Sequence, residues 1–276
     1  MEISLPVTVA VLVAALLHAS WNALLKGSSD KELDTVAISV GAGLIGVAGA
    51  LYLPAPAPAS WPWLAGSAAV HILYFVFLAG AYRWGELSYV YPIMRGGGPV
   101  IVALVSVAMF DEVLPLLPTL GVVLVCSGIV AFAAGKAESK ATLFALANAL
   151  VIAAYTLIDA KGARLSNNPV AYTLWFFAGN AVAIYAWAGV RRGAEVPRYL
   201  VRHWPRLAIG AFLTTASYAI ALYAMTLAPV ALVAVLRETS VLFAAVLGAL
   251  VFKEKFTRRR LAATGAVLIG LFALRL

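Results

Sequence analysis

The sequence has little charge, a single cysteine and no long polar stretch. Only 12% of its 276 residues are charged, whereas 63% are hydrophobic. With Cys126 alone, an intramolecular disulfide and a cysteine zinc cluster are both excluded. The connections between apolar segments do not exceed roughly 17 residues, which is too short for a soluble domain. These absences argue against a water-soluble protein.

What the sequence contains instead is a series of apolar stretches of about 18 residues or more, the length that spans a bilayer as a helix. The alternating polar and apolar strands of an outer-membrane barrel are absent. We therefore predict an all-α integral membrane protein with ten transmembrane helices. The expected spans are Pro6–Leu25, Thr35–Leu53, Leu64–Tyr82, Ser88–Phe110, Leu117–Ala134, Leu143–Lys161, Ala171–Val190, Leu207–Leu227, Val230–Phe252 and Leu261–Leu276.

The net charge of +8 follows the topology of the chain and does not indicate a nucleic-acid partner. Alternate connections carry 15 Lys and Arg residues, whereas the connections on the opposite side and the C-terminus carry three. By the positive-inside rule, the basic side faces the cytoplasm. Ten spans then place both termini outside, in a multi-pass protein of the cell (inner) membrane. The basic clusters are expected to contact lipid headgroups of the bilayer.

Two distant segments resemble each other. Arg95 and Arg237 lie near the middle of their spans and are 142 residues apart, as are Glu112 and Glu254 in the turns that follow. The sequence therefore predicts two five-helix repeats, residues 1–137 and 138–276. Because five is odd, the second repeat enters the membrane in the opposite sense. Inverted repeats place substrate sites near the bilayer midplane, between the halves.

An arginine at the centre of a membrane helix is costly and usually faces a cavity, a partner or a substrate route. Pro99 cannot donate the helix hydrogen bond that the carbonyl of Arg95 would accept. We expect a kinked or opened helix here, lining an anion site. The structural alternative is a packing kink in which Arg95 pairs with a carbonyl or with Glu238. The residues expected to break the helix are Gly96, Gly97, Gly98 and Pro99.

Polar and aromatic residues at helical spacing supply further candidates for a cavity wall. Packing and interhelical hydrogen bonds would explain the same pattern, and both readings stay open. Asp159 lies near the expected end of its span and is placed at the membrane interface. The predicted substrate-binding residues are Arg95, Arg237, His18, Trp21, Asn22, Tyr74, Tyr91, Tyr155 and Tyr218.

Glu238 is the acidic residue that we place near mid-membrane, and it has two open roles. It could carry a coupling proton, or it could neutralise Arg95. The three histidines lack metal-ligand spacing, and no phosphate-binding glycine loop is present. We therefore expect no metal, no cofactor and no enzymatic activity.

The first span reads His18-Ala-Ser-Trp-Asn-Ala-Leu-Leu-Lys26. Together with the paired five-helix repeats and their Phe-x-Glu turns, it resembles the EamA-type branch of the drug/metabolite transporter superfamily. The resemblance implies a ten-helix secondary carrier with a central cavity. It also implies structural roles for Glu112 and Glu254. Relatives of this type usually have cytoplasmic termini, in conflict with the charge count.

Two central arginines favour a substrate with a carboxylate, phosphate or phosphonate group. The expected function is secondary active transport, most naturally export, of an amino acid, organic acid or phosphonate by alternating access. Some relatives of this general type are associated with phosphonate use. The alternatives are a multidrug or cationic-metabolite exporter and, less favoured, a membrane enzyme acting on lipid headgroups. Monomer and homodimer are both compatible with the sequence.

The orientation is tested by fusing to each terminus a reporter that is active on one side of the membrane only. If the positive-inside rule holds for this chain, both reporters will signal from the external side. Cytoplasmic signals at both ends would reject the predicted orientation.

Overall fold

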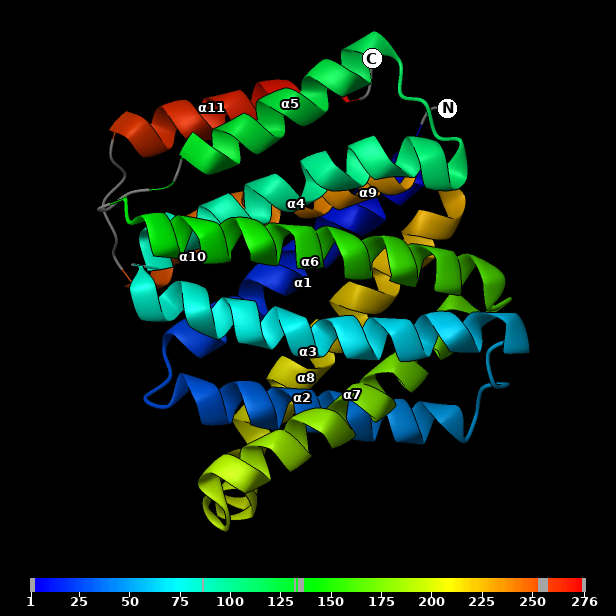
Figure 1. The fold of residues 1–276 in the computed structure, drawn as a ribbon, viewed down its shortest axis with the longest axis vertical. Helices are drawn as coiled ribbons and strands as arrows, with labels where there is room; N and C mark the ends of the chain where they lie inside the picture. The colour runs from blue at the N-terminus through cyan, green and yellow to red at the C-terminus, as the bar shows by residue number, and fades with distance from the viewer. Residues whose placement is uncertain (1–2, 86, 132, 134–136, 253–257, 275–276) are drawn as a thin grey trace.

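Long apolar helices joined by short turns make up most of the chain (Figure 1). The structure is a computed structural model that describes residues 3–85, 87–131, 133, 137–252 and 258–274. The helices are α1 (Leu5–Lys26), α2 (Lys31–Ala50), α3 (Trp61–Trp84), α4 (Leu87–Phe110), α5 (Leu116–Ala131), α6 (Ser139–Leu165), α7 (Pro169–Arg192), α8 (Glu195–Leu227), α9 (Val230–Arg237), α10 (Ser240–Phe252) and α11 (Arg258–Ala273), with a 3-10 turn η1 (Pro58–Ser60) before α3.

The predicted all-helical membrane class is confirmed, with a smaller number of full-length spans. Within the described residues, eight segments are long and apolar enough to cross a membrane. The remaining apolar helices, α5 and residues 262–273 of α11, are shorter. They occupy the fifth and tenth predicted spans. The Glu254 turn lies outside the described residues.

Local sequence explains where several helices begin. The Asp30 carboxylate accepts a hydrogen bond of 3.0 Å from the Leu33 N–H and caps α2. The Asn168 side chain caps α7 in the same way through the Ala171 N–H, also at 3.0 Å. Such caps satisfy donors that the first helical turn leaves free. α8 begins at Glu195. The expected start was Leu207, because the first turns of this helix are polar and resemble a connection between spans.

The expected opening of the fourth span at Gly96, Gly97, Gly98 and Pro99 is not found, since α4 is continuous from Leu87 to Phe110. The glycines serve close packing instead. A Cβ atom at Gly96 would lie 2.9 Å from the Cys126 carbonyl oxygen of α5, and one at Gly98 would lie 2.9 Å from a methyl group of Ile152 in α6. Neighbouring helices therefore support the backbone at this point.

The interruption lies in the ninth span, between α9 and α10. α9 ends at Arg237, and the Thr239 N–H donates to the Leu236 carbonyl oxygen at 3.1 Å. The Thr239 hydroxyl donates to the same carbonyl at 2.8 Å. A threonine that bonds to its local backbone competes with the regular helix ladder. The sequence after Arg237 therefore tightens the chain into a turn.

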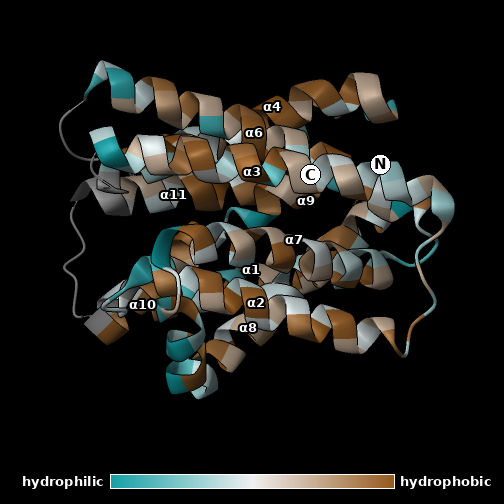
Figure 2. Cartoon of the chain, turned by 60° about the horizontal axis from the view of Figure 1, so that its bottom comes forward, coloured by the Kyte–Doolittle hydropathy of each residue, from teal (hydrophilic) through white to brown (hydrophobic). Residues whose placement is uncertain are grey.

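The helices form two layers, and each layer mixes early and late parts of the sequence (Figure 2). The first layer consists of α1, α2, α7 and α8, and the second of α3, α4, α5, α6 and α11. α9 contacts α4 and α1, and α10 packs on α1. We call one end of the bundle the α1–α2 end, where α1 stops and α2 starts. The opposite end, where α8 stops and α9 starts, is the α8–α9 end (Figure 1).

A seam of small residues holds α2 against α7. A Cβ atom at Gly46 would overlap the Leu174 carbonyl oxygen and lie 3.0 Å from the Ala178 nitrogen. One at Gly43 would lie 3.1 Å from the Phe177 carbonyl oxygen. Glycine is needed here because the two backbones approach each other too closely for a side chain.

Replacing Gly46 with alanine should lower the stability of the protein by about 1–3 kcal/mol, because the new methyl group must displace the α7 backbone. The matched control is Gly179→Ala, also inside a helix, where a Cβ would meet nothing within 4 Å. The control should be neutral or stabilising by up to about 1 kcal/mol. Thermal unfolding of the detergent-solubilised variants measures both, and equal behaviour would contradict the packing argument.

Candidate functional site

A cavity of about 490 Å³ lies between the two layers. It extends toward the α1–α2 end, where its wall includes Lys31, Tyr82 and Gly248. All nine substrate-binding residues predicted from the sequence lie on this wall. They are His18, Trp21 and Asn22 of α1, Tyr74 of α3, Tyr91 and Arg95 of α4, Tyr155 of α6, Tyr218 of α8 and Arg237 of α9.

The α1 part of the wall is ordered by contacts within the helix. The Trp21 indole N–H donates to His18 Nδ1 at 3.3 Å, and the Asn22 amide donates to the His18 carbonyl oxygen at 2.7 Å. The His18 and Trp21 rings meet edge to face, with their centroids 5.3 Å apart. This face therefore presents an aromatic surface held in a fixed orientation.

On another part of the wall, aromatic rings surround His71. Its ring centroid lies 4.3 Å from that of Tyr155 and 4.7 Å from that of Phe176. His71 Nδ1 is also 2.9 Å from the Ser67 carbonyl oxygen, one turn earlier in α3. Rings from α3, α6 and α7 thus form an apolar region beside the arginines. Such a wall suits the non-polar part of a small ligand.

Arg95 is buried and neutralised by Glu238. Its Nε lies 2.7 Å from Glu238 Oε2, although the N–H direction does not give a good hydrogen bond. Arg95 is only 6% exposed. A buried guanidinium needs such a counter-charge, because removing two isolated charges from water is expensive. The sequence leaves two roles open for Glu238, carrying a coupling proton and neutralising Arg95. The observed contact corresponds to the second role.

Arg237 is equally buried, at 5% exposure, but it differs in its partners. Among the described residues it forms no ion pair or hydrogen bond, and its Nε atom has no partner. Its guanidinium carbon lies 5.8 Å from the centre of the Tyr218 ring, a cation–π distance. The cavity wall therefore carries one guanidinium that forms no ion pair with a carboxylate of the described residues.

Asp159 is completely buried, with 0% exposure, so its side chain is enclosed by protein and does not face headgroups or water, contrary to what its expected place at the interface implies. α6 continues to Leu165, so Asp159 lies more than a turn inside the helix. The Tyr172 hydroxyl donates to one carboxylate oxygen at 2.9 Å, and the Tyr218 hydroxyl donates to the other. Through Tyr218, this carboxylate is linked to the cavity wall.

Several wall residues were missed by sequence reasoning because they lie in spans without a distinctive pattern. α7 contributes Phe176, Phe177 and Asn180, and α8 contributes Thr214 and Ser217. The lone amide of Asn180 in an apolar span was the available signal. Its contact with the cavity depends on how α7 packs across the bundle, which spacing alone does not reveal.

Comparison with known proteins identifies the class of this protein. The profile of the EamA-like transporter family matches residues 139–276, half of the chain. The chain therefore belongs to the EamA-like transporter family, and it is a multi-pass membrane transporter rather than an enzyme. This confirms the resemblance seen in the sequence.

The fold is shared with a solved structure described as "Crystal structure of protein". The two have a TM-score of 0.80 and 18% sequence identity, over 98% of both chains. At this identity the likeness concerns the fold alone. None of the curated proteins compared with the chain matches it.

Tyr172→Phe should destabilise the protein by about 1.5–3 kcal/mol, the range for a hydrogen bond to a charged group. The reason is that the buried Asp159 carboxylate loses one of its two tyrosine donors. In an Asp159→Asn background the same substitution should cost only about 1 kcal/mol. Thermal unfolding in detergent measures the coupling. Tyr185→Phe, at an exposed position of the same helix, is the control. Additive effects of the two substitutions would contradict this role for Asp159.

Proposed function

We propose that the protein is a secondary active carrier for a small metabolite with an anionic group, which it exports by alternating access. Its substrates would be amino acids, organic acids or phosphonates. The observation that carries this proposal is Arg237, a buried guanidinium on the cavity wall without an acidic partner among the described residues. An anionic group in the cavity would supply the missing counter-charge.

The rest of the wall fits a ligand of mixed character. The planar guanidinium can bind a carboxylate or phosphonate through two parallel hydrogen bonds. The rings of His71, Tyr155 and Phe176 would contact the carbon skeleton. His18, Trp21 and Asn22 of α1 provide polar groups on another part of the wall. A volume of about 490 Å³ is within the range of small-molecule sites.

We further propose that residues 1–137 and 138–276 are inverted repeats. If each helix is replaced by its counterpart five spans away, each pair of helices in contact corresponds to another pair that is also in contact. α2 packs on α7 and α5 on α11, while the α3–α6 contact has its counterpart in α8–α1. This pattern supports a two-fold relation between the halves, with the cavity at their interface.

Glu238 is our candidate for the coupling group. An anion that binds Arg95 would compete with Glu238 for the same guanidinium, 2.7 Å away. A carboxylate that loses its cation in a buried site is more readily protonated. Substrate binding and proton binding would then be linked at one pair of residues. If the termini are external, the α1–α2 end faces the cytoplasm, and the cavity seen here is the loading site for export.

A cationic-metabolite or multidrug exporter is the second candidate. It would need a carboxylate on the cavity wall that is free to bind a cation. Glu238 is held by Arg95 and Asp159 by two tyrosines, so neither is free in this structure. The charges therefore favour the anionic substrate.

Arg237→Gln should weaken anion binding at least about tenfold, because it removes charged hydrogen bonds worth about 1.5 kcal/mol or more. Binding is measured as thermal stabilisation of the purified protein by glutamate, succinate or aminoethylphosphonate. Transport of the same compounds into sealed vesicles gives the functional readout. Arg191→Gln, at a more exposed arginine of the α1–α2 end, should change neither.

Stabilisation of the wild-type protein by organic cations, with no response to any of the three anion classes, would overturn the proposed substrate class. Unchanged anion binding in a normally folded Arg237→Gln variant would show instead that this arginine is structural.

A further inference from the structure

The described polar contacts that join the two layers lie toward the α8–α9 end. The central residue is Glu112, in the turn between α4 and α5, which is only 4% exposed. One carboxylate oxygen accepts from Arg164 Nη2 at 2.6 Å. The other accepts from the Val230 N–H at 2.7 Å and so caps the start of α9.

Arg164, near the end of α6, carries this contact to the other layer. Its Nε donates to the Met225 carbonyl oxygen at 2.8 Å, and Nη2 donates to the Ala228 carbonyl oxygen at 3.2 Å. Both carbonyls belong to the C-terminal end of α8. The guanidinium also stacks 4.6 Å from the centre of the Phe110 ring. One cation therefore ties α4 and α6 of the second layer to α8 of the first.

A second link lies closer to the cavity. Asp159 of α6, in the second layer, accepts hydrogen bonds from Tyr172 of α7 and Tyr218 of α8, in the first. The Trp61 and Trp175 rings of α3 and α7, whose centroids are 5.2 Å apart, bring the layers together near the same end. The layers are thus in close contact between the cavity and the α8–α9 end.

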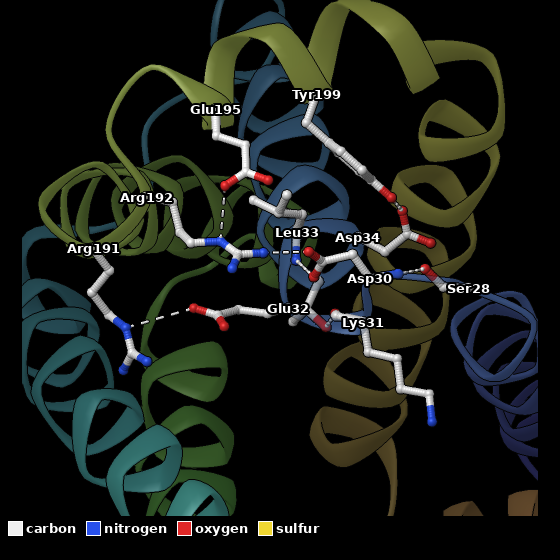
Figure 3. Close-up of polar contacts among 11 residues, drawn as sticks. Ser28, Asp30, Lys31, Glu32, Leu33, Asp34, Arg191, Arg192, Glu195 and Tyr199 are labelled. Carbon is white, nitrogen blue, oxygen red and sulfur yellow. Dashed lines mark hydrogen bonds and ion pairs between the residues drawn. The ribbon is translucent and has the colours of Figure 1, made fainter.

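The α1–α2 end is different, as Figure 3 shows. Arg192 and Arg191 of α7 point toward Asp30 and Glu32 of α2. The Tyr199 hydroxyl of α8 donates to Asp34 at 2.6 Å. All of these residues belong to the first layer. In the described part of the chain, the polar contacts at this end stay within one layer, and here the cavity extends outward.

We propose that Glu112, Arg164 and the end of α8 form a gate, called here the Glu112–Arg164 gate. It closes the α8–α9 end in the present state and breaks when the cavity opens there. Hydrogen bonds to charged groups are short and directional, so a small separation of the layers disrupts them together. This gives two discrete arrangements rather than a continuous one. The proposal rests on the alternating access of the proposed function, but not on the identity of the substrate.

The test compares distances across the two ends, measured between pairs of spin labels by pulsed electron resonance. One pair is placed at Val113, beside Glu112, and Leu227, at the end of α8; both are exposed. The other pair is placed at Arg83 and Val190, at the α1–α2 end. Cys126→Ala removes the native thiol before the labelled cysteines are introduced.

Glu112→Gln is the main variant, because glutamine can still accept from the Val230 N–H while losing the charge that pairs with Arg164. Arg164→Lys is the second, because lysine keeps the charge but cannot bind the carboxylate and both carbonyls as the guanidinium does. Each should raise the ratio of long to short Val113–Leu227 distances roughly tenfold, as expected for the loss of one charged hydrogen bond. The Arg83–Val190 distance should shorten in the same molecules.

The control is Glu32→Gln, which removes the same charge from an ion pair within the first layer, 3.7 Å from Arg191. It should leave both distance distributions unchanged. Unchanged distances in both gate variants would overturn the proposal. So would a longer Val113–Leu227 distance without shortening at the other end, since that describes local fraying. Neither result would affect anion binding at Arg237, which the thermal stabilisation assay measures separately.

Discussion

The constraint on which this structure depends is the cost of holding a guanidinium group inside a bilayer. Arg95 and Arg237, the two arginines in the middle of their spans, satisfy this constraint in different ways. Arg95 is neutralised by Glu238, which lies one residue beyond the other arginine, in the turn that interrupts the ninth span. Arg237 has the Tyr218 ring and the cavity instead. Of the two central arginines, one thus forms a closed ion pair, and the other is a cation that a ligand can reach.

The membrane class and the position of the cavity could be predicted from the sequence, since both follow from local patterns. Hydrophobic length identifies a span, and polar residues at helical spacing mark the face that avoids lipid. His18, Trp21 and Asn22 were recognised in this way, and they lie on the cavity wall. Their role in binding substrate stays a prediction.

The parts that sequence reasoning missed depend on contacts between distant helices. Asp159 looked interfacial because its span was predicted to end too early, and its partners Tyr172 and Tyr218 belong to other helices. The helix break was expected at the conspicuous glycines of α4, where α5 and α6 in fact support a continuous backbone. The break occurs instead where the Thr239 hydroxyl donates to a backbone carbonyl of α9. A threonine in a helical span is too common to predict a helix break from the sequence.

The two layers also indicate which groups of helices would move as units in the proposed alternating access. Each layer draws helices from both proposed repeats, so in the alternating access that we propose, the bodies that separate would be the layers and not the sequence halves. Contacts such as α2 with α7 and α5 with α11 lie inside a layer and can persist through a transport cycle. Those between α6 and the end of α8 lie across the layers and would break in the gate opening that we propose.

The glycine seam between α2 and α7 has a consequence for how the protein is made. Gly43 and Gly46 leave space that the α7 backbone and the Ala181 side chain fill, and α7 is synthesised more than a hundred residues after α2. The N-terminal half therefore cannot reach its final packing alone, and assembly in the membrane is completed only after α7 has left the ribosome.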